Sequence, residues 1–201
     1  VYSGATGTEM CSVISPPAGQ QFGNYFGGLA GDVNADGLQD FYVIDYLHIN
    51  QRGRIYVYSG ADCSLLHSIR GPVGSIYLFG RVRIGDLDGD GHDDLMLCSG
   101  QNNVGGQAAG AVYLYSGATG ESLGSYHADT ANMRMGTDAV SLGDVTGDGV
   151  PDIAVGVGNT QPGQGGFFIL PGAPLPPHEY CPSTANSTGE AAHTSSRKSL
   201  S

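Results

Sequence analysis

The amino-acid sequence predicts an all-β protein built from repeated four-stranded units, and three observations lead to this prediction. The 201 residues include 34 glycines, more than twice the usual share, and no stretch has helical periodicity. Two unrelated sequence phrases recur in step along the chain, about 55 residues apart. Short apolar or alternating runs, bounded by turn residues, lie between these phrases, which is typical of β-strands.

The first recurring phrase is a turn sequence, Tyr-Ser-Gly-Ala. It begins at Tyr2, Tyr58 and Tyr115, and a weaker copy, Leu-Pro-Gly-Ala, begins at Leu170. The second phrase is an acidic loop of the form Gly-Asp-x-x-x-Asp-Gly-x-x-Asp, with copies at residues 31–40, 85–94 and 143–152. Because two independent phrases keep the same period, the chain is organised as repeats.

Each repeat is predicted to contain four short strands. An apolar run follows each acidic loop, a tyrosine-rich alternating run comes next, and two further runs lead to the following loop. A unit of this size and strand number fits a blade of a β-propeller. A β-sandwich built from the same strands is the alternative, and the strict period disfavours it. The first runs are predicted at 41–44, 95–98 and 153–157, and the second at 54–58, 111–115 and 166–170. The third runs are predicted at 65–69 and 122–126, and the fourth at 78–84 and 136–142.

The acidic loops carry the main functional signal. They hold 11 of the 19 acidic residues of a chain whose formal charge is −11, and they contain no lysine or arginine. Carboxylates placed so closely repel one another unless a cation neutralises them, and oxygen ligands of this kind suit Ca²⁺ best. In each loop, positions 1, 3, 5 and 9 offer side-chain oxygens, the glycine at position 6 permits the chain reversal, and position 7 offers its backbone carbonyl. The sequence thus predicts up to three Ca²⁺ sites, formed by Asp32, Asn34, Asp36, Leu38 and Asp40; by Asp86, Asp88, Asp90, His92 and Asp94; and by Asp144, Thr146, Asp148, Val150 and Asp152.

Two other kinds of calcium loop begin with a similar pattern. An EF-hand closes with a bidentate Glu at position 12 and is flanked by helices. Position 12 here is Val43, Leu97 or Val155, each within a predicted strand, so the EF-hand interpretation fails. A dockerin loop is also followed by a helix, which residues 41–44 do not resemble. Because Thr146 stands in place of an acid, the third site is predicted to be the weakest.

The pattern of a Phe-Gly pair, an acidic loop and an apolar strand resembles the FG-GAP repeat of integrin α-subunits and of many secreted bacterial proteins. Phe-Gly occurs at Phe22 or Phe26 and at Phe79, and Met135 takes the place of the phenylalanine in the third repeat. The resemblance covers roughly residues 1–173. It implies a propeller whose loops between the first two strands of a blade bind Ca²⁺, in a secreted, extracellular or cell-surface protein. It does not fix an activity.

The expected organisation is a remnant of a preceding blade over residues 1–21, three blades over 22–173, and a Pro/Ser/Thr-rich linker or tail over 174–201. The family resemblance implies propellers of about seven blades, so three blades would leave sheet edges and one face open. We therefore expect an incomplete propeller, with further blades supplied by the same chain or by another copy.

The four cysteines lack the spacing of a metal site. A pair such as Cys11 and Cys63 could form a disulfide outside the cell. Cys98 lies in an apolar run and is predicted to be a small buried hydrophobic residue.

Composition and motifs exclude several functional classes. Eight Lys and Arg residues do not form the basic face of a nucleic-acid-binding protein, and no apolar run approaches the roughly 20 residues of a membrane span. No H-E-x-x-H or G-x(4)-G-K-[ST] motif occurs, and no catalytic residue is predicted. Asp93 beside Asp94 is interpreted as the charged rim of a metal loop, and Arg81 and Arg83 as members of a local ion pair.

Two functional hypotheses follow. The leading one is a non-catalytic extracellular calcium-binding module for adhesion or for binding a protein or a glycan. The alternative is an accessory propeller domain of a secreted hydrolase or lyase, with the chemistry outside this stretch or in the central cleft of the propeller.

Overall fold

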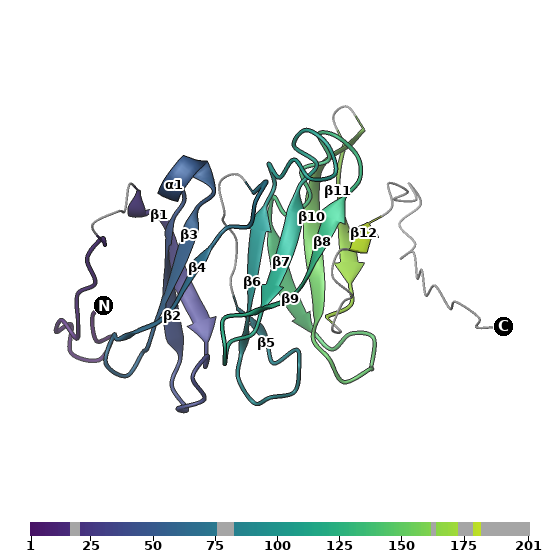
Figure 1. Cartoon of the computed structure of the whole chain (residues 1–201). Helices are drawn as coiled ribbons and strands as arrows, with labels where there is room; N and C mark the ends of the chain where they lie inside the picture. Colours follow the sequence, from purple (N-terminus) through teal and green to yellow (C-terminus); the bar gives the residue numbers. More distant parts are fainter. Residues whose placement is uncertain (17–20, 76–82, 162–163, 173–178, 182–201) are drawn as a thin grey trace.

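In the described part of the chain, three β-sheets lie side by side like successive blades (Figure 1). The computed structural model describes residues 1–16, 21–75, 83–161, 164–172 and 179–181. In this part of the chain the one α-helix is the four-residue α1 (His48–Gln51), which the sequence did not predict. No helix among these residues is long and apolar enough to cross a membrane. The all-β prediction is therefore confirmed.

The sheets are formed by strands that follow one another in sequence and pair antiparallel. The first sheet contains β1 (Phe22–Gly31), β2 (Asp40–Asp45), β3 (Arg54–Tyr58) and β4 (Leu65–Arg70). The second contains β5 (Arg83–Gly85), β6 (Asp94–Ser99), β7 (Ala111–Tyr115) and β8 (Ser122–Ala128). The third contains β9 (Ala139–Gly143), β10 (Asp152–Gln161) and β11 (Gln164–Leu170).

Some strands differ from those predicted. The ten-residue β1 was not predicted, although it contains the Phe-Gly pairs that begin at Phe22 and Phe26. The strand expected over 136–142 begins at Ala139, because the Met135 N–H is bonded to the Ala109 carbonyl and Gly136, with φ +79°, turns the chain. The N-terminal part of the strand expected over 78–84 lies outside the described residues.

A further strand joins the second sheet from the segment expected to be a linker or tail. It is β12 (Glu179–Cys181), which pairs in parallel with β8. In the described residues, the second sheet thus has five strands and the third has three, where four per blade were expected.

Two hydrophobic clusters fill the spaces between consecutive sheets. Along β2 and β6, alternate side chains face opposite sides of the sheet. Every residue of β6 is buried, so both faces of this strand are covered. The strands that precede the acidic loops, β1, β5 and β9, lie next to one another. This arrangement is that of consecutive blades in a propeller that does not close. The first cluster joins Tyr42 and Ile44 to Leu95 and Leu97, and the second joins Met96 and Cys98 to Ile153 and Val155.

Among the described residues, the outer face of the third sheet is apolar and exposed. Phe167 and Ile169 of β11 are 69% and 44% exposed, and Val140 of β9 is 41% exposed. Val140 and Ile169 both pair with Ala154 of β10, so they lie on one face of the sheet. The expectation that an incomplete propeller leaves one face open is met.

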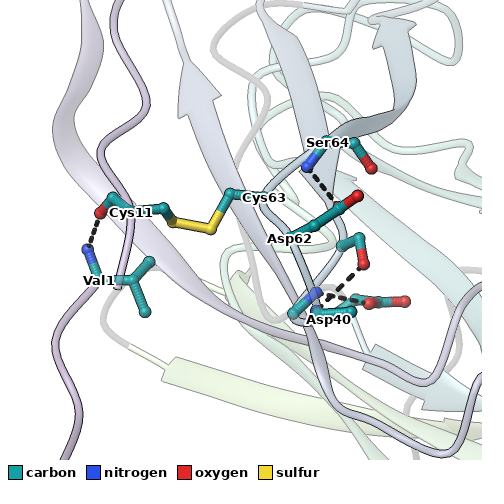
Figure 2. The surroundings of a disulfide bond; sticks show 9 residues. Val1, Cys11, Asp40, Asp62, Cys63 and Ser64 are labelled. Atoms are coloured by element: carbon teal, nitrogen blue, oxygen red, sulfur yellow. Dashed lines mark hydrogen bonds between the residues drawn. A yellow bond between two sulfur atoms is a disulfide. The ribbon is translucent and has the colours of Figure 1, made fainter. Parts of the chain in front are cut away.

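The cysteines behave as predicted where the structure describes them. Cys11 and Cys63 form a disulfide with Cα atoms 6.4 Å apart, which ties the N-terminal segment to the turn after β3 (Figure 2). Cys98 is fully buried, and burial raises the pKa of its thiol to about 12. Cys98 is therefore an inert part of the core.

Candidate metal centre

The three acidic loops connect the first two strands of each sheet. They join β1 to β2, β5 to β6 and β9 to β10, and all three lie at the same end of the molecule, at the bottom in Figure 1. This is the location that the family resemblance implies for Ca²⁺ loops.

The aspartate at position 1 organises each loop through its two carboxylate oxygens. Oδ2 accepts the N–H of the position-6 glycine, and Oδ1 accepts the N–H of position 5. The glycines have φ of +85°, +90° and +90°, a conformation that strains other residues, so the reversal needs glycine. In the order of the three loops, the bonds from Gly37 to Asp32, from Gly91 to Asp86 and from Gly149 to Asp144 are each 2.9 Å long, and those from Asp36, Asp90 and Asp148 are 3.0, 3.2 and 3.1 Å long.

Positions 3 and 5 close the turn. Asp36, Asp90 and Asp148 accept the N–H of position 7 at 2.8, 2.9 and 2.9 Å. Asn34 and Asp88 accept the position-5 N–H at 3.1 and 3.2 Å. In the third loop the Thr146 hydroxyl instead lies 3.5 Å from Oδ1 of Asp152.

The aspartate at position 9 is fully buried in every loop. Oδ2 of Asp40, Asp94 and Asp152 accepts the position-2 N–H at 2.8, 2.7 and 2.9 Å. In the first two sheets, Oδ1 accepts a second N–H, from Gly60 to Asp40 at 2.9 Å and from Gly117 to Asp94 at 2.8 Å. These aspartates therefore fix the loop to the body of the blade.

Gly60 and Gly117 belong to the recurring Tyr-Ser-Gly-Ala turn, so the two repeated phrases of the sequence contact each other. A Cβ on Gly117 would collide with the Asp93 carbonyl, and one on Gly60 would collide with the Gln39 carbonyl. The turn thus needs glycine both for space and for its N–H. Sequence reasoning missed this role, although the common period of the two phrases is the signal that points to it.

The charge of the second loop is poorly balanced by the protein alone. Burial raises the pKa of Asp94 to about 6; the N–H groups of Gly117 and Leu87 oppose this shift, and the charges of Asp88 and Asp90 add to it. At position 1 of the third loop, backbone N–H groups, that of Gly149 first, lower the pKa of Asp144.

The second loop brings three carboxylates together. Single oxygens of Asp86, Asp88 and Asp94 all lie within 4.8 Å of one another. Ligands on one Ca²⁺, each about 2.3–2.6 Å from the ion, have this spacing, so the three residues fit around a common ion. Among the residues that the structure describes, no other group of three acidic, His or Cys side chains is so close.

Several predicted ligands are therefore not gathered in this way. Asp90 of the second loop is not part of this group, and neither the oxygens of Asp32, Asp36 and Asp40 nor those of Asp144, Asp148 and Asp152 meet the same spacing in the described structure. The carbonyl ligands predicted at Leu38, His92 and Val150 stay predictions, as do the side-chain ligands predicted at Asn34 and Thr146.

Comparisons with known proteins agree with the repeat. Residues 32–97 and 86–155 match the family profile of the FG-GAP-like repeat. The chain is 31% identical to integrin alpha-E of Mus musculus over 163 residues, 69% of this chain and 14% of that protein. It is 33% identical to integrin alpha-4 of Xenopus laevis over 119 residues, 54% of this chain and 11% of that protein. It is 31% identical to integrin alpha-2 of Bos taurus over 166 residues, 72% of this chain and 14% of that protein. The chain thus spans about a seventh or less of the length of these relatives.

Proposed function

This chain belongs to the FG-GAP repeat family, and on that premise we propose that it is an extracellular, non-catalytic module that binds Ca²⁺ in its acidic loops and uses the propeller for adhesion, by binding a protein or a glycan. The observation that carries the proposal is the convergence of Asp86, Asp88 and Asp94 within 4.8 Å. Ca²⁺ supplies the positive charge that balances these carboxylates, and the loops supply the oxygen ligands.

The role of each loop residue follows from its contacts. Position 1 ligates the ion and shapes the turn, positions 3 and 5 add oxygens from the exposed side, and the buried position 9 approaches the ion from the blade. Position 7 adds a carbonyl. The loops bind up to three ions. The third is the weakest, because Thr146 offers only a neutral hydroxyl where the first two loops offer an amide oxygen (Asn34) or a carboxylate (Asp88).

Two observations support an extracellular location. The Cys11–Cys63 disulfide is a feature of oxidising compartments. The relatives to which the chain is similar are integrin alpha chains, which also favours the adhesion-type role.

The open face of the third sheet supports the proposal that a further blade packs against this chain. Within the molecule, the equivalent faces of the first and second sheets are covered by the next sheet. A blade from the same chain or from another copy would cover Val140, Phe167 and Ile169 in the same way.

The ligand assignment is tested by comparing two alanine variants. Asp90→Ala removes a charged oxygen donor, so we expect it to weaken the second site about tenfold or more, since a charge-assisted contact contributes about 1.5–3 kcal/mol. Thr146→Ala removes a neutral hydroxyl and is expected to weaken the third site by a smaller factor. Competition titration against a fluorescent Ca²⁺ chelator measures both changes.

Asp129→Ala is the matched control, because Asp129 is exposed, lies outside the loops and carries the same charge as Asp90. It should leave all Ca²⁺ affinities nearly unchanged. An Asp90→Ala variant that binds Ca²⁺ as tightly as the Asp129→Ala variant would contradict the assignment.

A further inference from the structure

The second acidic loop reaches across to the first. The N–H of Asp93 donates to the carbonyl of Asp32 at 3.0 Å, and the N–H of Asp32 donates to Oδ2 of Asp93 at 2.9 Å. Beside this reciprocal pair, Nδ1 of His92 donates to the carbonyl of Val33 at 2.8 Å. Positions 7 and 8 of the second loop are thus bonded to positions 1 and 2 of the first.

Asp93 is held in place on both sides. Its side chain is 19% exposed, and its Oδ2 lies 3.4 Å from Nε of Arg83, which accounts for the local ion pair expected at this arginine. The carboxylate rests on Gly31, whose φ is +100°; a Cβ there would come within 2.6 Å of the Asp93 Cβ. The glycine before the first loop therefore makes room for the side chain of the second.

The second and third loops meet at the equivalent positions, but a different residue makes the contact. Gly85, with φ +96°, precedes the second loop as Gly31 precedes the first, and it faces Pro151, the residue equivalent to Asp93. A Cβ on Gly85 would lie 3.3 Å from Cγ of Pro151. Proline has neither an N–H nor a carboxylate, so neither bond of the Asp93–Asp32 pair can form here.

We propose that Asp93 couples the first two metal loops, so that Ca²⁺ in the second raises the affinity of the first, whereas the third loop binds independently. This inference rests on the proposed function of the loops as Ca²⁺ sites. Asp93 is a positioning residue: it stands between the predicted ligands His92 and Asp94 and holds the backbone of Asp32.

The coupling acts through the ordering of the loops. Ca²⁺ in the second loop fixes the chain on both sides of Asp93, and Asp93 then fixes the N–H and carbonyl of Asp32. The Asp32 carboxylate orders the first loop through the N–H groups of Asp36 and Gly37. A loop that is already ordered loses less conformational entropy when it binds its ion, so its affinity rises, and the effect is reciprocal.

The test measures the occupancy of each site separately. The N–H groups of Gly37, Gly91 and Gly149 each donate to the position-1 aspartate of their own loop, so their amide NMR signals report the three sites one by one during a Ca²⁺ titration. Asp88→Ala disables the second site. We expect it to reduce the affinity reported by Gly37 about fivefold, the lower range of measured coupling, and to leave that of Gly149 unchanged.

Variants at Asp93 decide whether this residue carries the effect. In an Asp93→Ala background, Asp88→Ala should no longer change the affinity at Gly37. Asp93→Asn keeps an oxygen that accepts the Asp32 N–H and should retain most of the coupling. Pro151→Ala, at the equivalent place in the third loop, should leave the coupling of the first two sites unchanged.

If the signals of all three glycines report Ca²⁺ binding but Asp88→Ala does not change the affinity reported by Gly37, the coupling is overturned and the proposed function stands. A titration that shifts none of the three signals would overturn both.

Discussion

Removal of Ca²⁺ by EDTA is expected to lower the melting temperature of this chain by about 15 °C or more, and excess Ca²⁺ is expected to restore it. A ligand held at 100 times its dissociation constant stabilises the folded state by about 2.7 kcal/mol per site, and each kcal/mol shifts the melting temperature of a chain of this size by about 2–4 °C. Three sites together give the expected shift. Without the ion, the repulsion among Asp88, Asp90 and the buried Asp94 is uncompensated.

Circular dichroism melts in EDTA, in Ca²⁺ and in Mg²⁺ measure this effect. Mg²⁺ is the control, because it is smaller, requires near-octahedral geometry and gives up its water reluctantly, so it should restore less of the stability. Identical melts in EDTA and in Ca²⁺ would show that the loops fold and persist without a metal.

Asp94→Ala is expected to lower the free energy of unfolding by about 4 kcal/mol in Ca²⁺. The Asp94 carboxylate accepts the N–H of Leu87 at 2.7 Å and that of Gly117 at 2.8 Å, and Asp94 is fully buried. Alanine leaves both donors without this partner, at a cost of about 1–3 kcal/mol each, and it also removes a predicted Ca²⁺ ligand. Urea titrations in saturating Ca²⁺ measure the change.

Asp94→Asn separates the two roles of this side chain. The amide keeps an accepting oxygen and the volume of the carboxylate but removes the negative charge. Asparagine can accept only one of the two N–H groups that Asp94 accepts, and its NH2 group faces the other. Because burial raises the pKa of Asp94, the charged form is disfavoured in the metal-free protein, and loss of the charge offsets part of this cost, so the asparagine variant should lose less stability than the alanine variant in EDTA. In Ca²⁺ it should be clearly destabilised.

The exposed Asp129→Ala serves as the control here too and should change the free energy of unfolding by no more than about 0.5 kcal/mol. An Asp94→Ala variant as stable as Asp129→Ala would show that the position-9 carboxylate does not fix the loop to the blade.

The sequence predicted the features that depend on local pattern. The acidic loops and the strands after them lie where the repeat places them, with β2, β6 and β10 beginning at Asp40, Asp94 and Asp152. Alternation and turn residues are sufficient there, because the same local pattern occurs three times.

Features that depend on contacts between segments were not predicted. β12 pairs with β8 from a segment of Pro, Ser and Thr, where no local pattern indicates a strand. The N–H of Gly117 reaches Asp94 across 23 residues, and Asp93 reaches Asp32 across 61 residues. The interpretation of Asp93 as a charged rim was therefore incomplete, since its partner lies in the neighbouring blade.

The number of Ca²⁺ ions bound per chain tests the central claim most directly. After equilibrium dialysis against millimolar Ca²⁺, elemental analysis of the purified chain should give close to three ions, and two when Asp86 and Asp88 are both changed to alanine. A chain that retains no Ca²⁺ above the dialysis buffer would contradict the account.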